Sequence, residues 1–431
     1  MTTYNYTNDP NVVFNPNSDV LLIDTGTAAD LFVSQVGTSV RFIGSGHLAI
    51  LQNVTPGQLT STNVKVQDGS VMLVGDNTIG TADDDLGNVL ISGPGNDLLI
   101  GLGGNDSLDG GAGLDRIYGN TGDDSVRGSP GNDIVFGGQG NDIVDYFSQS
   151  GALQIYGNLG DDQLFGASGS DKIFGGQGND SINGGNGDNL LIGGLGRDTL
   201  FGGDGNDRLE GGDGNDQLLP GLGNNAIYGN QGDDVIGGAI GATADVIFGG
   251  QGNDSILYQN QNADSFANIY GNLGDDSIQG SPGTDFIQGG QGNDSIRGNG
   301  DYDGITPGLG NDTLVVAVQG SGSDSGITES TSDIVVSFLT GSDKIRGLLG
   351  GTDVPGAANN YNEYADDNVA SVGQAVTSYA TQPDNNYTYI AGQFYGFLVI
   401  DYNKDGAADG VITFNFLLKA TLADFAFTDI I

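Results

Sequence analysis

The chain has 431 residues, of which 79 are glycine, and its 55 acidic residues against 12 basic ones give a formal charge of −43. The absence of cysteine excludes disulfide scaffolds and thiolate metal sites, and a single histidine excludes metal centres built from several histidines. Because phosphate binding needs clustered Lys and Arg, this charge argues against nucleic acid and anionic membrane surfaces as partners.

The beginning of the chain shows no export or membrane signal. Residues 1–17 contain no Lys or Arg and no apolar core segment, so they do not predict a cleavable signal peptide. No run of 18 apolar residues occurs, which predicts no membrane-spanning segment.

Residues 1–91 predict a small β-rich domain that caps the repeats behind it. His47 lies in a predicted turn before a strand, and we interpret it as structural because no nucleophile accompanies it. Short apolar and β-branched runs, punctuated by Gly and Thr, predict strands at Val20–Asp24, Val40–Ile43, Leu48–Val54, Asn63–Asp68 and Val71–Gly75.

From Ser92 to Val315 the chain divides into 24 consecutive units, 21 of nine residues and three longer ones. A well-formed unit is Gly137-Gly-Gln-Gly-Asn-Asp142-Ile-Val-Asp145. Position 8 is apolar in every unit, and position 6 is Asp in 19 of the 21 nonamers. A flexible Gly-rich linker would not keep an apolar residue at every ninth position. The longer units are Tyr146–Tyr156, Gly238–Phe248 and Tyr258–Tyr270.

The spacing predicts parallel β coils. Positions 7 to 9 make a three-residue strand whose middle side chain faces inward, and the Gly-rich positions 1 to 6 make a turn. Two units close one coil of 18 residues, so the 24 units give 12 coils. Stacking then places one Asp above another at about 4.7 Å, and Ca²⁺, which takes six to eight oxygen ligands, would remove their repulsion.

Units counted from Ser92 as odd or even lie on opposite edges of such a roll. In the even units position 6 is always Asp, whereas in the odd units it is replaced at Leu153, Asn189, Asn225 and Ala267. All three longer units are also odd. We therefore predict one uninterrupted column of calcium sites and one with gaps and protruding loops.

The odd strands also predict an outward aromatic ladder at position 9. One interpretation is a contact surface, for self-association or for a cell-surface glycan. The other is cross-strand stacking that the insertions or a flanking domain partly cover. The ladder consists of Tyr118, Phe136, Tyr156, Phe174, Tyr228, Phe248 and Tyr270.

Residues 316–431 form a third predicted domain, in which the nonamer stops. A helix is predicted over Asp366–Tyr379 and strands over Tyr389–Ile400 and Val411–Leu418. Between the strands, Asp401, Asn403, Asp405 and Asp409 match the opening of a calcium loop. Ile412 stands where an EF-hand has Glu, so this segment is either a different calcium site or an Asx/Gly-rich hairpin turn.

The nonamer resembles the repeat of RTX, or haemolysin-type, calcium-binding proteins. The resemblance implies an all-β, right-handed parallel β-roll in which each Ca²⁺ lies between turn i and turn i+2 and is held by Asp and main-chain carbonyls. It implies roughly 15–20 calcium ions, held by Asp97, Asp106, Asp115, Asp124, Asp133, Asp142, Asp162, Asp171, Asp180, Asp198, Asp207, Asp216, Asp234, Asp245, Asp254, Asp276, Asp285, Asp294, Asp303 and Asp312.

The resemblance also implies a secretion route and a location. Such proteins leave the cell through type I secretion machinery, and Leu422–Ile431, acidic and apolar, resembles the uncleaved signal of that route. We therefore expect a secreted, extracellular or cell-surface protein that folds on calcium and serves a surface layer or extracellular matrix.

No catalytic motif is found, and we expect no enzyme. One histidine rules out H-E-x-x-H, and no G-x-S-x-G elbow is present. The alternatives are a glycan-binding adhesin and a calcium-dependent polysaccharide lyase or epimerase. Arg116 and Arg208, on the aromatic face, are the residues that such an enzyme would use.

Overall fold

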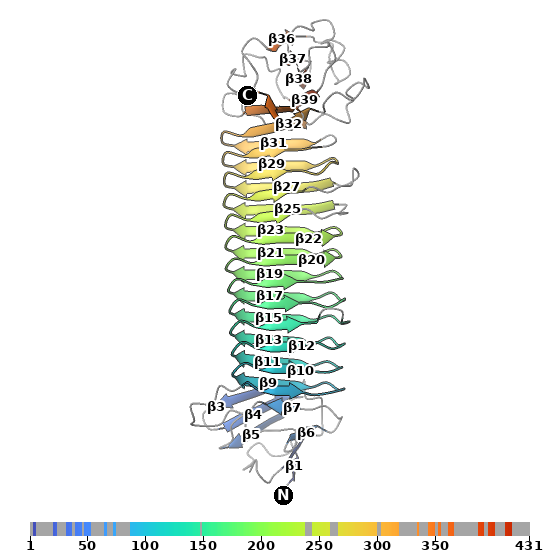
Figure 1. Ribbon diagram of the computed structural model, residues 1–431, viewed down its shortest axis with the longest axis vertical. Helices are drawn as coiled ribbons and strands as arrows, with labels where there is room; N and C mark the ends of the chain where they lie inside the picture. The colour runs from blue at the N-terminus through green and yellow to red at the C-terminus, as the bar shows by residue number, and fades with distance from the viewer. Residues whose placement is uncertain are drawn as a thin grey trace. The chain divides into compact units, whose positions relative to one another are not determined.

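The computed structural model describes residues 87–146, 149–237, 244–258, 266–299 and 303–314 with their side chains, and outside these ranges the backbone of the strands named below. Two compact units, Met1–Glu210 and Gly211–Ile431, make up the chain. Within each unit, short strands stack as successive β coils (Figure 1).

In the first unit, parallel strands form an odd face and an even face. Residues that pair between neighbouring coils lie 18 apart, or 20 apart where a long unit intervenes. The odd-face strands are β9 (Leu98–Gly103), β11 (Arg116–Thr121), β13 (Ile134–Gln139), β15 (Gln154–Leu159), β17 (Lys172–Gln177) and β19 (Leu190–Leu195), followed by β21 (Arg208–Asp213). The even-face strands are β8 (Val89–Ile91), β10 (Ser107–Asp109), β12 (Ser125–Arg127), β14 (Ile143–Asp145), β16 (Gln163–Phe165), β18 (Ser181–Asn183) and β20 (Thr199–Asp204).

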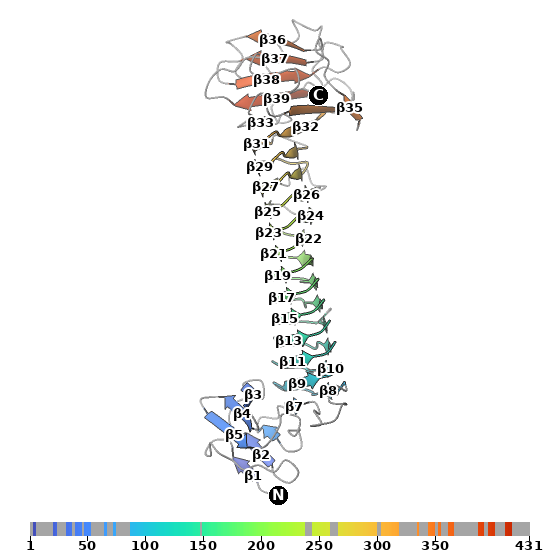
Figure 2. The same ribbon diagram turned by 90° about the vertical axis from the view of Figure 1, so that its left-hand side faces the viewer.

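The second unit repeats this arrangement. Its odd face holds β23 (Ala226–Gln231), β25 (Ala244–Gln251), β27 (Phe266–Leu273), β29 (Phe286–Gln291) and β31 (Gly304–Leu309). Its even face holds β22 (Gln217–Leu222), β24 (Val235–Gly237), β26 (Ser255–Leu257), β28 (Ser277–Gln279), β30 (Ser295–Arg297) and β32 (Thr313–Val318). Seen from the side, the odd-numbered and the even-numbered coil strands form separate columns within each unit (Figure 2).

The position-8 side chains form the core between the two faces. All 24 of them, from Leu99 to Leu314, are at most 2% exposed. Outside β9, where Leu98 and Ile100 are buried as well, their neighbours at positions 7 and 9 are half-buried or exposed, as in β12, where only Val126 is buried. The predicted all-β roll of parallel coils is therefore confirmed. One apolar residue per strand is enough to fill its core, because that core is only one side chain thick on each face.

The odd-face strands are longer than predicted. β11 spans six residues rather than three, and its pairing with β13 continues through Asn120 opposite Gly138. Asn120 has φ 79°, a left-handed conformation that Asn tolerates, and its side-chain amide donates to the Tyr118 carbonyl at 3.4 Å. The prediction of three-residue strands holds for most even strands but is wrong for the odd face, where pairing runs into the turn.

The five strands predicted before the coils are found at their predicted positions, as β2 (Val20–Ile23), β4 (Ser39–Gly44), β5 (His47–Gln52), β6 (Val64–Val66) and β7 (Met72–Val74), whereas β1 (Thr3–Asn5) and β3 (Phe32–Val36) were not predicted. β1, β2 and β6 form one sheet, and β3, β4 and β5 form another. β7 pairs in parallel with β9. His47 begins β5 and pairs with Gly44, so its predicted place in a turn is wrong.

The strands after the coils are also β structure. β33 (Ile334–Val335) and β34 (Lys344–Leu349) pair in parallel with β31 and β32. They are followed by β35 (Thr352–Val354), β36 (Tyr361–Ala365), β37 (Tyr387–Ala391), β38 (Tyr395–Ile400) and β39 (Gly410–Asn415). The strand predicted over Tyr389–Ile400 is in fact the antiparallel pair β37 and β38, because Gly392 interrupts the apolar run.

Some predictions fall outside the described residues, namely the helix over Asp366–Tyr379 and the terminal segment Leu422–Ile431. The domain boundaries at residues 91 and 315 stay predictions, although coil-like parallel pairing already joins β8 to β10 and continues from β32 to β34. In the described part of the chain, no helix has the length and apolar character needed to cross a membrane.

Candidate calcium sites in the turns

The position-6 aspartates point into the turns and tie neighbouring coils together. In a regular turn, the main-chain N–H of Asp106 donates to Oδ1 of Asp124, one coil further on, at 2.8 Å. The same bond recurs along both edges, for example from Asp97 to Asp115. Every one of these aspartates is at most 2% exposed, so Oδ1 has a structural task in a dry interior.

The other carboxylate oxygen, Oδ2, has no such bond. In Asp124 it is buried and has no hydrogen-bond partner. Leaving a buried charged oxygen unpaired costs several kcal/mol, as an order of magnitude, so a repeated row of such atoms points to a bound ion or water. The same condition holds at Oδ2 of Asp115, Asp133, Asp142, Asp162, Asp180, Asp234, Asp245, Asp254, Asp276 and Asp294.

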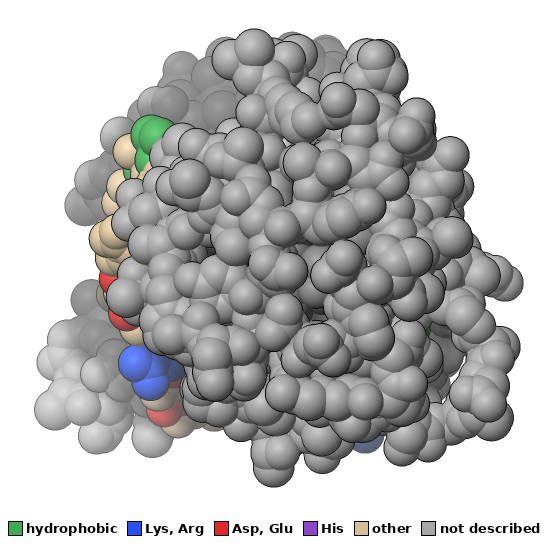
Figure 3. Space-filling view, turned by 90° about the horizontal axis from the view of Figure 1, so that it is seen from above, with side chains coloured by type: hydrophobic (Ala, Val, Ile, Leu, Met, Phe, Trp, Pro, Cys, Tyr) green, Lys and Arg blue, Asp and Glu red, His purple; other side chains and the backbone are tan. Residues whose placement is uncertain are grey.

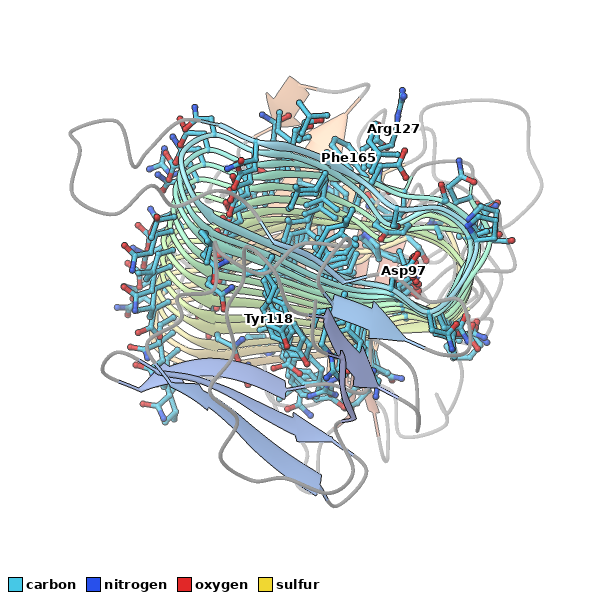
Figure 4. The ribbon with its side chains drawn as sticks, turned by 90° about the horizontal axis from the view of Figure 1, so that it is seen from below. Asp97, Tyr118, Arg127 and Phe165 are labelled. Atoms are coloured by element: carbon cyan, nitrogen blue, oxygen red, sulfur yellow. The ribbon has the colours of Figure 1, made fainter. Side chains whose placement is uncertain are left out.

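The glycine at position 1 leaves room beside Oδ2. A Cβ on Gly119 would collide with Oδ2 of Asp124 and with the carbonyl oxygen of Gly137, one coil further on. Gly101 faces Asp106 and the carbonyl of Gly119 in the same way. A carboxylate oxygen and a main-chain carbonyl therefore converge on a space that only glycine leaves open. Figure 4 shows Asp97 inside a turn, between the face of Tyr118 and the face of Arg127 and Phe165.

The turn interior disfavours an uncompensated negative charge. Burial is the main reason that the pKa of Asp124 rises from its ordinary 3.8 to about 7. The hydrogen bond from the Asp106 N–H lowers this pKa, and the negative charges of Asp142 and Asp106 raise it. The pKa values of Asp115, Asp162, Asp234, Asp276 and Asp294 are likewise about 7. A cation in the turn would reverse this shift by neutralising neighbouring carboxylates together.

The donor set fits a hard divalent cation. Carboxylate and carbonyl oxygens with no sulfur or imidazole are what Ca²⁺ prefers. The described residues contain no group of three or more His, Asp or Glu side chains placed to hold a metal. Each regular turn offers the carboxylate of one position-6 Asp and the main-chain carbonyls of nearby glycines.

An outer ladder at position 5 of the even turns was not predicted. The N–H of Asp123 donates to Oδ1 of Asn105 at 3.0 Å, and the N–H of Asn141 donates to Oδ1 of Asp123 at 2.8 Å. It runs opposite to the buried ladder, in which each N–H donates to the following coil. Asn and Asp alternate here from Asn105 to Asn179 and again from Asn215 to Asn293, which keeps like charges apart, and this alternation was the available signal in the sequence. In the end-on view, the described surface mixes acidic, basic and hydrophobic side chains (Figure 3).

The structure places the predicted ligands in two groups. All twelve even-edge aspartates are buried at equivalent places, and so are the eight odd-edge ones. The four odd-edge replacements are buried at the same places, and Asn189 still accepts from the Asp171 N–H at 2.9 Å. The assignment of each residue as a ligand stays a prediction. The second predicted site, Asp401 to Asp409, lies outside the described residues.

The aromatic ladder is stacked within each unit. Ring centroids of Tyr118 and Phe136 lie 4.9 Å apart with nearly parallel planes, and the stack continues to Tyr156 and Phe174. In the second unit Phe248 stacks between Tyr228 and Tyr270. These rings are half-buried, so cross-strand stacking is confirmed and a flat apolar stripe remains on each unit.

The repeats match a known family model. The model of the RTX calcium-binding nonapeptide repeat, which covers four copies, matches residues 80–117, 112–144, 156–191, 183–218, 221–243, 241–262, 270–305 and 279–314. No curated protein matches the chain. The matched segments contain the turns described above, with their buried aspartates and their glycines. The chain therefore belongs to the family of proteins that carry RTX calcium-binding nonapeptide repeats.

Proposed function

We propose that this is a secreted structural protein that folds when it binds Ca²⁺ outside the cell and contributes to a surface layer or extracellular assembly. The observation that carries the proposal is the buried Oδ2 of the position-6 aspartates, of which Asp124 is an example. A dozen or so such charges cannot be held together without a cation, and the repeats are those of a calcium-binding family.

Coupled folding follows from the location of the ligands. Each turn takes oxygens from neighbouring coils, so the site exists only when the coils are stacked. Ligand that binds only the folded state stabilises it by about 2.7 kcal/mol per site at one hundred times Kd. In a calcium-poor cytosol the acidic chain would stay extended, a state suited to type I secretion, and it would fold in calcium-rich surroundings.

The assembly role draws support from the stacked aromatic stripe. The rings are half-buried, and contiguous apolar stripes that stay partly exposed on a soluble protein often mark contact surfaces. Size-exclusion chromatography and electron microscopy with and without Ca²⁺ test for assembly. Light scattering of a variant carrying Tyr118→Ser, Phe136→Ser and Phe174→Ser then tests the stripe. We expect smaller particles, and unchanged association of a folded variant would remove the stripe from the proposal.

Glycan binding is the second candidate, and one contact favours it. Arg116 makes a hydrogen bond with Tyr118 on the aromatic face, and such a cation beside stacked rings suits an acidic sugar. Binding of acidic polysaccharides that persists when assembly is blocked would favour the adhesin over the structural protein. The carbohydrate-active enzyme remains the weakest candidate, since Arg208 is engaged by Glu210 at 2.6 Å, and reducing-end assays on the same polysaccharides test it.

A further inference from the structure

Two odd-edge turns, one in each unit of the chain, differ from the regular ones. Their position-6 residues are Leu153 and Ala267, each 1% exposed. Position 1, which is Gly in most units, is here Tyr146 and Tyr258. These tyrosines are the largest fully buried side chains in the part of the chain that the structure describes.

The Tyr146 ring occupies the space that oxygen atoms share in a regular turn. Beside Gly119, that space is bordered by the Asp124 carboxylate and a main-chain carbonyl. Beside Gly128, at the equivalent place, the nearest atoms are carbons of the Tyr146 ring. The main chain of Tyr146 keeps the regular pairing, since its N–H donates to the Phe165 carbonyl at 3.1 Å.

The phenol also reaches the aspartate of the preceding odd turn. The Tyr146 hydroxyl lies close enough to Asp133 to lower the pKa of that carboxyl, and the Tyr258 hydroxyl has the same effect on the pKa of Asp245. The phenol thus favours the charged form of a buried carboxylate without a cation. The arrangement is the same in both units, although the two long units differ in length.

The aspartate of the odd turn that follows each tyrosine turn accepts hydrogen bonds from its own turn. The Ala167 N–H donates to Oδ2 of Asp171 at 2.7 Å, and the Ser281 N–H donates to Oδ2 of Asp285 at 2.6 Å. The Ser281 hydroxyl lies 3.0 Å from both carboxylate oxygens of Asp285. In a regular turn such as that of Asp124 this oxygen has no hydrogen-bond partner. The carboxylate after a tyrosine turn is therefore satisfied by its own turn, and the carboxylate before it faces the phenol.

We propose that Tyr146 and Tyr258 take the place of the cation in these two turns, so that the odd edge binds calcium in separate groups of turns. The inference rests on the proposed calcium binding and refines it, because it says which turns hold no ion. The ring fills the volume that the Asp carboxylate and Ca²⁺ would otherwise occupy. The hydroxyl supplies a hydrogen-bond donor in place of the positive charge of the ion.

Restoring the regular residues tests the proposal. The double variant Tyr146→Gly with Leu153→Asp gives this unit the Gly and Asp that the equally long unit Gly238–Phe248 has, and Tyr156→Phe in the same coil is the matched control. Bound calcium is counted by mass spectrometry of the metal after gel filtration in calcium buffer, and folding is checked by circular dichroism. We expect at least one more Ca²⁺ per chain for the double variant and none for the control. An equal count for the folded variant and the wild type overturns the proposal, whereas a wild type with no calcium removes the proposed function instead.

The wild-type protein offers a second test that does not depend on a variant folding. Crystals grown with Tb³⁺ in place of Ca²⁺ give anomalous peaks at the bound ions. We expect peaks in the even-edge turns and none in the turns of Tyr146 and Tyr258. A peak inside either tyrosine turn overturns the proposal.

Discussion

The main-chain N–H of Asp106 donates to Oδ1 of Asp124 at 2.8 Å, while Oδ2 of Asp124 is buried without a hydrogen-bond partner. One carboxylate therefore has two tasks, because Oδ1 aligns the coils and Oδ2 presents its charge to the turn interior. An amide can perform the first task but not the second. Asn189 shows this on the odd edge, where its Oδ1 accepts from Asp171 and its Nδ2 donates to the Gly202 carbonyl at 3.3 Å.

Asp124→Asn is expected to separate the two tasks. The amide keeps the acceptor for the Asp106 N–H, so the coil stays folded in calcium, but the chain binds at least one Ca²⁺ fewer. Asp124→Ala also removes the acceptor and is expected to cost a further 1–3 kcal/mol or so. The measurements are calcium stoichiometry and denaturant unfolding in calcium buffer.

Asp123→Asn is the matched control, because the neighbouring Asp123 lies exposed on the outer ladder and accepts only the Asn141 N–H. We expect it to leave the calcium count unchanged. Loss of calcium from both variants, or from neither, would contradict the assignment of Oδ2 as a ligand.

Gly119→Ala tests the space beside that oxygen. The new Cβ would collide with Asp124 Oδ2 and the Gly137 carbonyl, so we expect loss of the ion from this turn and destabilisation by about 1–3 kcal/mol. Gly93→Ala is the control, since a Cβ there meets nothing within 4 Å. Thermal unfolding and the count of bound calcium compare the two, and an equal calcium count and melting temperature would contradict a ligand site in this space.

The pH dependence should change sign with calcium. In the metal-free coil, burial raises the pKa of Asp115 and Asp124 from 3.8 to about 7. A folded-state pKa above the unfolded value favours the folded state at low pH, and this contribution is lost as the pH rises through about 7. We therefore expect calcium-free protein to gain β structure on acidification from neutral pH toward pH 5, measured by circular dichroism.

In calcium buffer the same acidification should weaken calcium binding, because protons compete for the carboxylates. Calcium titrations at several pH values measure this. A calcium-free protein that loses structure on acidification, or an affinity that ignores pH below 7, would conflict with buried carboxylates as the ligands.

The core prediction concerns position 8. Ile117 is fully buried, and Ile117→Ala is expected to cost about 2–5 kcal/mol in calcium. Ile143 is 41% exposed at position 7, and Ile143→Ala is expected to stay within about 0.5 kcal/mol. Denaturant unfolding measures both, and similar costs would mean that the inward and outward positions are wrongly assigned.

Much of the roll can be predicted from one sequence because the period carries the geometry. An apolar residue such as Ile117 at every ninth position allows only a stack of short strands, and Asp124 and its equivalents then fall on one edge. The length of the odd strands could not be predicted in this way. It depends on Asn120 taking a left-handed conformation that lets pairing continue into the turn, which the apolar pattern does not report.

The tyrosine turns could not be derived from the period either. Tyr146 falls in a long unit, and the sequence suggested a protruding loop rather than a buried ring. The available signal was that two replacements occur together. Tyr146 replaces Gly in the same unit in which Leu153 replaces Asp, and Tyr258 and Ala267 form the same pair of replacements in another unit. Only the structure shows that the ring fills the place of the missing carboxylate.

The central claim is that calcium holds the coils together, and a chelator titration followed by far-UV circular dichroism tests it most directly. We predict that the β signal of the calcium-loaded protein falls steeply as EGTA removes the metal, because many linked sites lose their ligand together, and that it returns when Ca²⁺ is restored. Retention of the full β signal in excess chelator would contradict the claim.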